Sequence, residues 1–443
     1  MLSSKRELRS WYFYDWANSA YSTTVITLFL GPYLTTIAEN AQINGLVNFF
    51  GFPIPAGSVF PYSITISVIL QALILPIVGG ITDYINRKKT LLGIFALSGA
   101  LLTMLFFFLD DGLYIFGALL LIFSNLFFGC SIVVYNSFLN DISAYSDREK
   151  VSSKGWATGY IGGGLLLIIN LLLFLFGENF GISSSLAVRI NLASAGVWWG
   201  LFSIPSLIFL KNGYSKLNVA NHKLTLSKSI SGTFRNIGAT FKDAKNYPMA
   251  LIFLLAYLFY NDGVQSVITL SSLFGQEELG LELTFLTIVI LAVQFLAAFG
   301  SILFYWVTKK LGEKNTLVIS IALWCIVIFY AFAFLSGKID FFILALIIAL
   351  LMGGTQAISR SLYSKLIPAG KEAEYFSIYE ISEKGTSWMG PLAFGLVYQI
   401  THSYRLAILS LLLFFILGGV ILLFSKIRLN NNPQITLENE FKD

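Results

Sequence analysis

The chain has 443 residues, of which 56% are hydrophobic and only 12% are charged. Soluble globular proteins carry about 25% charged residues, and a soluble chain of this length could not bury so large an apolar fraction. The aromatic content of 16% and the mean hydropathy of +0.75 agree with this. The composition excludes a disordered chain, a disulfide scaffold and a nucleic-acid-binding protein, and it predicts a polytopic membrane protein.

The residue types that hold metals or nucleotides are scarce. Cys130 and Cys325 lie in apolar runs, which is typical of small buried hydrophobic residues rather than a redox pair. His222 and His402 are isolated, and the chain has no Gly-rich phosphate loop ending in Gly-Lys-Ser/Thr. We therefore expect no metal, no other cofactor and no direct use of ATP.

Apolar runs recur along the chain, and each can cross ~30 Å of hydrocarbon as a helix. They predict an all-α membrane protein with 12 transmembrane helices in two pseudo-repeated six-helix bundles. The expected spans are 11–35, 60–82, 90–109, 112–139, 152–176, 188–210, 248–272, 283–307, 315–336, 340–366, 378–400 and 403–425. An even number of spans places both termini on the same side.

The basic residues gather in alternate connections. One set holds Arg87, Lys88, Lys89, Arg148, Lys150, Lys154, Lys309, Lys310, Lys314, Lys365 and Lys371, whereas the other set holds only Arg189, Lys338 and Arg405 near helix ends. This positive-inside pattern predicts cytoplasmic termini. We expect a multi-pass protein of a bacterial inner membrane.

A polar stretch at 211–247 separates the two halves. It carries seven Lys or Arg against one acid, a surplus larger than the net charge of +5 of the whole chain. It is either a regulatory insert or a linker lying on anionic headgroups. We predict an N-terminal bundle at 1–210, a cytoplasmic linker at 211–247 and a C-terminal bundle with a short tail at 248–443.

The two halves share short sequence patterns, as tandem repeats do. The first span has Tyr14-Asp15-Trp16-Ala17-Asn18-Ser19 where the seventh has Tyr260-Asn261-Asp262-Gly263-Val264-Gln265. Lys154-Gly155 opens the fifth span and Lys384-Gly385 the eleventh. The loop at 79–88 has a weaker counterpart at 300–310.

That loop reads Gly79-x-x-x-Asp83 followed by the basic pair Arg87-Lys88. It resembles the signature loop of the major facilitator superfamily, although Tyr84 stands where a basic residue is usual and Asn86 where glycine is usual. The segments 14–20, 260–264 and 353–361 resemble the vacuolar amino-acid effluxer branch associated with autophagy. The resemblance covers nearly the whole chain and implies export of neutral amino acids.

Ionisable groups inside hydrocarbon are costly and therefore need a reason. Asp262 is expected near the midplane of the membrane and Asp15 nearer the cytoplasmic end. Each of the two aspartates binds solute or protons, or else it has a structural hydrogen-bonding role. Arg360 can hold a substrate carboxylate through its two-pronged guanidinium, or it pairs with Asp15 or Glu380 to lock one conformation.

Neutral polar groups on spans one, four, seven and ten complete this hypothesis, because these spans line the central cavity in the superfamily that the chain resembles. The candidates are Asn18, Tyr135, Asn136, Asn261, Gln265 and Gln356. Their amides and hydroxyl can bind an amino or carboxylate group. The alternative for each is a helix-packing contact.

Two further groups point to conformational change. Gly79, Asp83, Arg87, Lys88, Glu380 and Glu383 are predicted to form a cytoplasmic latch, with snorkelling to water as the alternative for the two glutamates. Gly155, Gly159 and Gly163 share one helix face, which allows close helix approach for sliding or static packing.

These observations predict a secondary transporter, active or facilitative, that moves a small polar solute such as a neutral amino acid by alternating access. A membrane enzyme is disfavoured because paired acids and histidines at a membrane face are lacking. The alternatives are a transport-dead sensor or partner-binding protein, or a transporter of sugars or organic anions. The expected partners are a small solute, the lipid bilayer and protons, with the protein acting as a monomer.

Overall fold

A computed structural model describes residues 4–84, 87–142, 148–211, 247–367, 378–379, 382, 387–425 and 427. The predictions on Glu380, Glu383 and the linker residues 212–246 lie outside these residues. The side chain of Asp83 is not among the described parts either. The division of the chain into domains at 210 and 248 stays a prediction.

The first half is almost entirely helical. Its helices are α1 (Lys5–Ala20), η1 (Tyr21–Phe29), α2 (Leu30–Glu39), η2 (Ala56–Ser58), α3 (Val59–Tyr84), α4 (Lys88–Met104), η3 (Leu105–Phe108), α5 (Tyr114–Ser137), α6 (Leu139–Ile142), α7 (Arg148–Phe176), η5 (Gly177–Phe180) and α8 (Ser184–Phe209). The predicted spans 2 to 6 each match one long helix of this set.

The second half follows the same plan. Its helices are α10 (Pro248–Leu279), α11 (Leu283–Leu311), α12 (Glu313–Ala333), α13 (Gly337–Leu366), α15 (Met389–Thr401), α16 (Tyr404–Ser410) and α17 (Leu412–Phe424). Among the described residues, ten helices are long and apolar enough to cross a membrane. The first predicted span is divided by η1, and the eleventh is represented by α15 alone. The all-α architecture is thereby confirmed.

The first span runs without a break from α1 through η1 to α2, but η1 is a π-helix. Its sequence is rich in threonine, and Thr27 Oγ1 donates to the carbonyl of Ser22, five residues back. Hydroxyl groups that bond to preceding carbonyls loosen the α-helical ladder. The carbonyl of Leu28 accepts a 2.6 Å hydrogen bond from Ser272 Oγ of α10. The π segment therefore offers a backbone acceptor to the other half.

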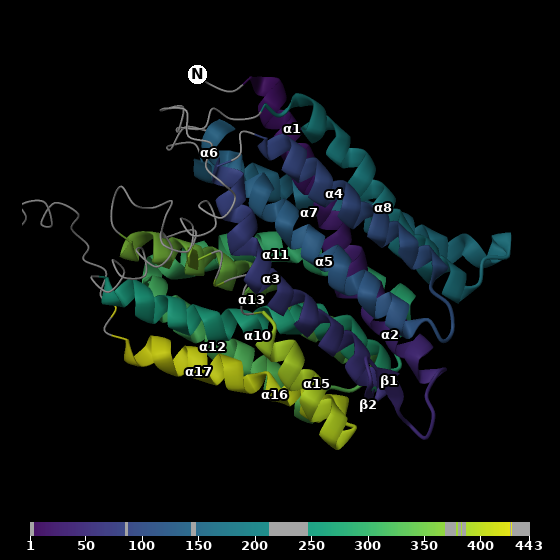
Figure 1. The fold of residues 1–443 in the computed structure, drawn as a ribbon. Coiled ribbons are helices and arrows are strands. Elements are labelled where there is room, and N and C mark those ends of the chain that lie inside the picture. Colours follow the sequence, from purple (N-terminus) through teal and green to yellow (C-terminus); the bar gives the residue numbers. More distant parts are fainter. Residues whose placement is uncertain are drawn as a thin grey trace, which may run out of the picture.

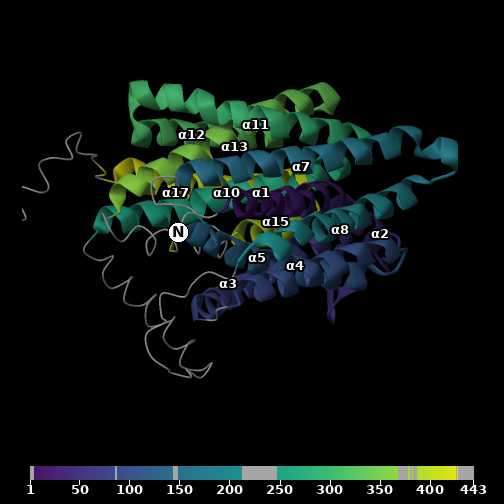
Figure 2. The same ribbon diagram turned by 90° about the horizontal axis from the view of Figure 1, so that it is seen from above.

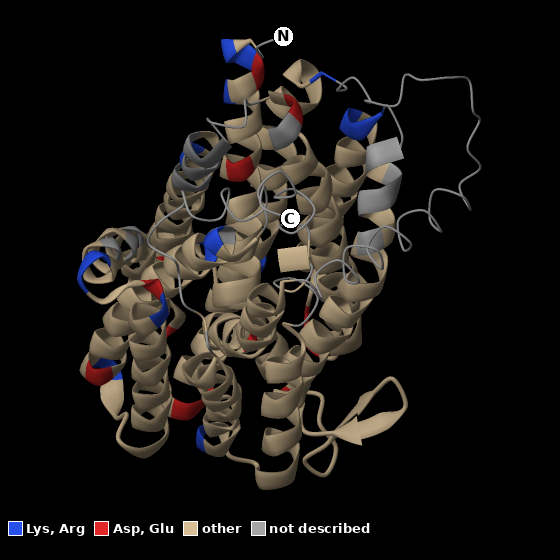
Figure 3. Cartoon of the chain, turned by 90° about the vertical axis from the view of Figure 1, so that its left-hand side faces the viewer, with Lys and Arg blue, Asp and Glu red and all other residues tan. Residues whose placement is uncertain are grey.

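The helices lie roughly along one direction, with the first half in the upper part of Figure 1 and the second half in the lower part. Seen from above, α1 and α10 lie in the middle of the bundle (Figure 2), and α10 contacts η1 and α2. Charged residues are sparse along the helices (Figure 3). We call the end that holds the start of α1 the terminal end, and the opposite end the hairpin end.

The hairpin end carries two short strands, β1 (Val47–Phe49) and β2 (Phe52–Ile54), which pair antiparallel with Phe49 opposite Phe52. The two-residue turn uses Phe50 and Gly51, with φ of +50° and +96°. Two positive φ values define the turn type whose twist suits a hairpin, and asparagine-glycine is its usual sequence. Phenylalanine is strained in this conformation.

Candidate functional site

Asp15 of α1 is held by Tyr135 of α5. The Tyr135 hydroxyl donates a 2.8 Å hydrogen bond to Asp15 Oδ2. Tyr135 is fixed in turn by Trp11, whose ring stacks on it at 4.5 Å between centroids and whose Nε1 donates to its carbonyl. The fold thus brings together two predicted site residues that are 120 positions apart in the chain.

A glycine face of α7 lies against Asp15. A Cβ at Gly155 would come within 2.4 Å of Asp15 Oδ2, and one at Gly159 within 2.5 Å of Ser19 Oγ. Both distances are too short for a real contact, so the two helices can approach this closely only because these positions lack side chains. Gly163 is looser, since its Cβ would be 3.2 Å from Thr23 Oγ1.

The closest backbone approach between α7 and α1 involves a glycine that the sequence analysis passed over. A Cβ at Gly162 would lie 2.5 Å from the carbonyl oxygen and 2.9 Å from the Cα of Trp16. Gly162 is one helical turn beyond Gly159, so its position on the same face could have been read from the helical period. Whether this face slides during transport stays a prediction.

Asp262 of α10 is fully buried. Within the described part of the chain, no side chain donates to either of its carboxylate oxygens, and the backbone N–H of Gly390 is the donor that lies near them. A Cβ at Gly390, the second residue of α15, would lie 3.3 Å from Asp262 Oδ2, so the carboxylate lies at the positive end of that helix. An ionised carboxylate buried without a charged partner is costly. Asp262 is therefore suited to receive a proton or a cationic group.

The two aspartates have matching surroundings. The segments Asp15–Ser19 and Asp262–Ser266 both read Asp-x-x-Asn/Gln-Ser, and each aspartate faces a glycine of another helix, Gly155 or Gly390. If the halves are aligned on Tyr14 and Tyr260 instead, Asp15 falls opposite Asn261, and the shared Asp-x-x-Asn/Gln-Ser pattern is not seen. Each half thus has an aspartate of this pattern that lies against a glycine of a neighbouring helix.

The polar residues of α13 lie on two different faces of the helix. Thr355 and Ser359 are buried and form hydrogen bonds within the second half. Gln356 is half-buried and Arg360 is exposed. Arg360 lies near enough to Tyr160 of α7, in the first half, for its charge to act on that side chain.

The remaining predicted polar residues differ in burial. Asn18 and Asn261 are buried, and Asn18 lies near enough to Asp15 to interact with its carboxylate. Asn136 and Gln265 are half-buried. Whether these amides bind a solute stays a prediction.

The described part of the predicted latch forms contacts within the first half. Lys88 Nζ lies 2.8 Å from Asp141 Oδ2 of α6 and donates to the carbonyl of Ser137. Arg87 is exposed just before α4, and Gly79 lies inside α3. These contacts connect the start of α4 to the end of α5, and a latch between the halves stays a prediction.

The two halves are joined at the hairpin end by hydrogen bonds. They run from Ser58 Oγ to the Gly395 carbonyl (3.1 Å), from Ser272 Oγ to the Leu28 carbonyl (2.6 Å), from Gln276 Nε2 to Thr36 Oγ1 (3.4 Å) and from the Tyr62 hydroxyl to Gln399 Oε1. We call this set the hairpin-end seal. This end of the bundle is closed.

Two carboxylates of opposite halves meet beside the seal. Gln276 bonds to Thr36 and also to Glu277 Oε1 at 3.1 Å, and Glu39 lies one turn beyond Thr36. The charges of Glu39 and Glu277 act on each other and on Tyr404. Burial raises the pKa of the Glu39 carboxyl, which lies beyond the predicted first span.

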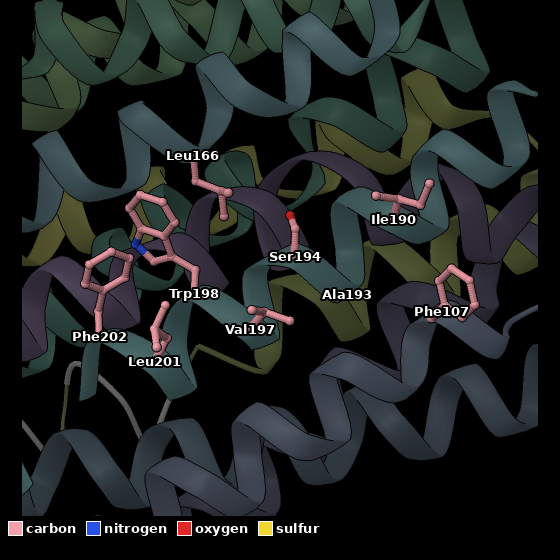
Figure 4. Close-up of a pocket in the computed structure, with 9 residues that line it drawn as sticks. All are labelled: Phe107, Leu166, Ile190, Ala193, Ser194, Val197, Trp198, Leu201 and Phe202. Carbon is pink, nitrogen blue, oxygen red and sulfur yellow. The ribbon is translucent and has the colours of Figure 1, made fainter. Parts of the chain in front are cut away.

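A groove on the outside of the first half is shown in Figure 4. It has a volume of about 380 Å³ and lies between η3, α7 and α8. Its lining is apolar except for Ser194, whose hydroxyl donates to the Asn191 carbonyl and to Asn170 Oδ1. It contains none of the predicted solute-binding residues, so it is distinct from the candidate site around Asp15 and Asp262.

Comparison with known proteins supports this architecture. Residues 3–146 and 140–432 match the family described as vacuole effluxer Atg22 like. The uncharacterized MFS-type transporter YxiO of Bacillus subtilis (strain 168) is 32% identical over 421 residues, covering 95% of this chain and 94% of the relative. Autophagy-related protein 22 of Yarrowia lipolytica is 27% identical, covering 86% of this chain and 77% of the relative.

Solved structures show the same fold at low identity. A bacterial homologue of the iron transporter ferroportin in the inward-facing state has a TM-score of 0.65 and 15% identity, covering 95% of this chain and 98% of that one. The fold is therefore that of a multi-pass membrane transporter.

Proposed function

This chain belongs to the Atg22-like vacuole effluxer family of the major facilitator superfamily, and from that premise we propose that it carries a neutral amino acid across the membrane by alternating access. It is a membrane transporter of the MFS type and not an enzyme. The name of the matched family speaks of efflux from vacuoles, and the fungal relative is an autophagy-related protein.

One observation carries the proposal: each half contributes an aspartate in the same Asp-x-x-Asn/Gln-Ser pattern that lies against a glycine of another helix. Asp15 keeps a hydrogen bond to Tyr135, whereas no side chain among the described residues donates to Asp262. Transporter sites lie near the midplane between the repeats. We propose that Asp262 binds the ammonium group of the solute or a proton, and that Asp15 binds one of these two in the first half.

Arg360 is assigned to the carboxylate group of the solute. Its side chain is exposed and lies near Tyr160 of α7, which suits a solute held between the halves. A guanidinium binds a carboxylate through two parallel hydrogen bonds, which lysine does not match. Gln356, one turn before Arg360, supplies an amide on the same helix face.

Alternating access requires the closed end to open. The hairpin-end seal consists of neutral hydrogen bonds, and each contributes only about 0.5–1.5 kcal/mol. With the termini in the cytoplasm, as the basic connections favour, this state opens toward the cytoplasm. Breaking the seal then exposes the site to the other side.

Transport in proteoliposomes tests the proposal. The protein is reconstituted with radiolabelled neutral amino acids, and counterflow and pH-driven accumulation are measured. Asp262→Asn is expected to lose pH-driven accumulation and to reduce transport efficiency about 30- to 150-fold, which is 2–3 kcal/mol for a stranded partner charge. Asp340→Asn, an acid at the start of α13 that bonds to Ser336, is the matched control and should transport normally.

Arg360→Ala tests the carboxylate assignment. It should lose affinity for the amino acid but not for its methyl ester, which lacks the charge. Unchanged pH dependence in Asp262→Asn would remove Asp262 as the coupling group and leave Asp15. Flux of a sugar or organic anion without amino-acid flux would favour the other solute classes, and absence of any flux would favour a sensor.

A further inference from the structure

The groove of Figure 4 faces the lipid. Val197 and Leu201 on its floor are 51% and 57% exposed although they are apolar, and α8 is one of the candidate membrane spans. The indole nitrogen of Trp198 donates to the Trp16 carbonyl of α1, so the polar atom of this side chain is already bonded. Hydrocarbon therefore covers this surface when the helix spans a bilayer.

The length of the groove suits one acyl chain. Ile190 and Phe202 both line it and are 12 residues apart on α8, which corresponds to ~18 Å of helix at 1.5 Å per residue. One leaflet contributes about half of the ~30 Å hydrocarbon core. The groove also begins near the hairpin end, because Ile190 follows the start of α8 at Ser184.

The mouth of the groove at that end is charged. Arg189 precedes Ile190, and its Nη1 lies 3.5 Å from Asp110 Oδ2, just beyond η3. The Nε atom of Arg189 is buried and has no hydrogen-bond partner among the described residues. Asp111 is exposed next to Asp110 and accepts a hydrogen bond from Asn40. One cation and two carboxylates thus lie within four residues of the lining residues Ile190 and Phe107.

This charge pattern selects the headgroup. The guanidinium of Arg189, whose side chain is 22% exposed, can bind phosphate, whereas two exposed carboxylates attract an ammonium and repel a net negative charge. We propose that the groove is a binding site for one zwitterionic phospholipid of the phosphatidylethanolamine type. Its acyl chain lies along α8, its phosphate at Arg189 and its ammonium at Asp110 and Asp111. The site is independent of the solute proposed above.

Native mass spectrometry tests the site. The detergent-purified protein is mixed with equal amounts of phosphatidylethanolamine and phosphatidylglycerol, and the retained lipid is identified. The wild type should keep one phosphatidylethanolamine. Val197→Trp fills the groove and should reduce that occupancy about tenfold. Ile208→Trp on the same helix is exposed but outside the groove, and it should retain the lipid.

Charge variants separate the headgroup from the chain. Arg189→Gln should reduce phosphatidylethanolamine binding several-fold, whereas Lys338→Gln, which removes another cation paired with an acid, should not. In vesicles, phosphatidylethanolamine with brominated acyl chains should quench Trp198, and Trp198→Phe should remove that part of the quenching. Equal occupancy in Val197→Trp and Ile208→Trp, or preferred binding of phosphatidylglycerol, would overturn the proposal.

Discussion

The contact between α7 and α1 predicts different effects for alanine at different glycines of α7. In Gly155→Ala the new Cβ would lie 2.4 Å from Asp15 Oδ2 and 2.9 Å from the Trp11 ring, so the carboxylate or the helix must move by about 1 Å to regain a contact of ~3.5 Å. Asp15 is a side chain and yields more easily than backbone. Its movement breaks the 2.8 Å hydrogen bond from Tyr135.

The expected loss of transport efficiency follows from the strength of the hydrogen bond between Tyr135 and Asp15. A hydrogen bond to a charged group contributes about 1.5–3 kcal/mol, and alanine gains up to about 1 kcal/mol of helix propensity over glycine. If transport needs Asp15 in this position, the loss corresponds to a reduction of about 10- to 100-fold in transport efficiency. The folded state should lose the same bond and gain the helix propensity of alanine, a net destabilisation of about 0.5–2 kcal/mol.

Alanine substitutions at two other glycines of α7 serve as comparisons for Gly155→Ala, one more disruptive to packing and one less. In Gly162→Ala the Cβ meets the backbone of Trp16 at 2.5–2.9 Å, which no rotamer relieves, so we expect about 1–3 kcal/mol of overpacking and a lower unfolding temperature. In Gly164→Ala the Cβ contacts Leu291 and Phe295 at 3.8–3.9 Å, an ordinary distance. That variant should be as stable and as active as the wild type.

Both properties are measured on the same preparations. Thermal unfolding in detergent reports stability, and initial transport rates in proteoliposomes at matched protein orientation report activity. The expected result is an activity loss with a modest stability loss for Gly155→Ala, a larger stability loss for Gly162→Ala and neither for Gly164→Ala. Normal transport by a folded Gly155→Ala would refute the argument that the position of Asp15 matters.

Three further predictions concern other parts of the molecule. Phe50→Asn should relieve the left-handed strain and stabilise the hairpin by about 1 kcal/mol, seen as slower amide exchange at residues 47–54, and faster exchange would contradict this. The raised pKa of Glu39 means that the folded chain holds a proton that the unfolded chain releases, so stability should fall as pH rises above the ordinary value of 4.5, and Glu39→Gln should make the unfolding temperature depend less on pH in that range. Asp83→Asn should slow turnover with affinity within a few-fold, as substrate titrations of the transport rate would show, and normal turnover would exclude a latch role.

The membrane architecture could be predicted because the bilayer imposes it locally. A helix must satisfy its own backbone hydrogen bonds and cover hydrocarbon, so each span leaves a continuous apolar run in the sequence. The helices α3, α5, α8 and α12 follow the predicted spans closely for this reason. The π-helical segment at Tyr21–Phe29 was not predicted, because its period change comes from threonine hydroxyls and a contact with α10.

The candidate site was only partly predictable. The sequence indicated that Asp15 and Asp262 are exceptional, because ionisable residues inside spans are costly wherever they pack. It did not show that Asp15 has Tyr135 as a partner while no described side chain donates to Asp262, or that Arg360 is exposed and lies near Tyr160 of α7.

The sequence alone therefore determined which segments cross the membrane and which polar residues they carry, since both depend on neighbours within one helix. The tertiary structure decided which of those residues meet, which glycines touch backbone, and which charges stay unpaired. Gly162 and Asp262 owe their roles to α1 and α15, far away in the chain. Burial and pairing depend on contacts between distant segments, and no local pattern in the sequence specifies them.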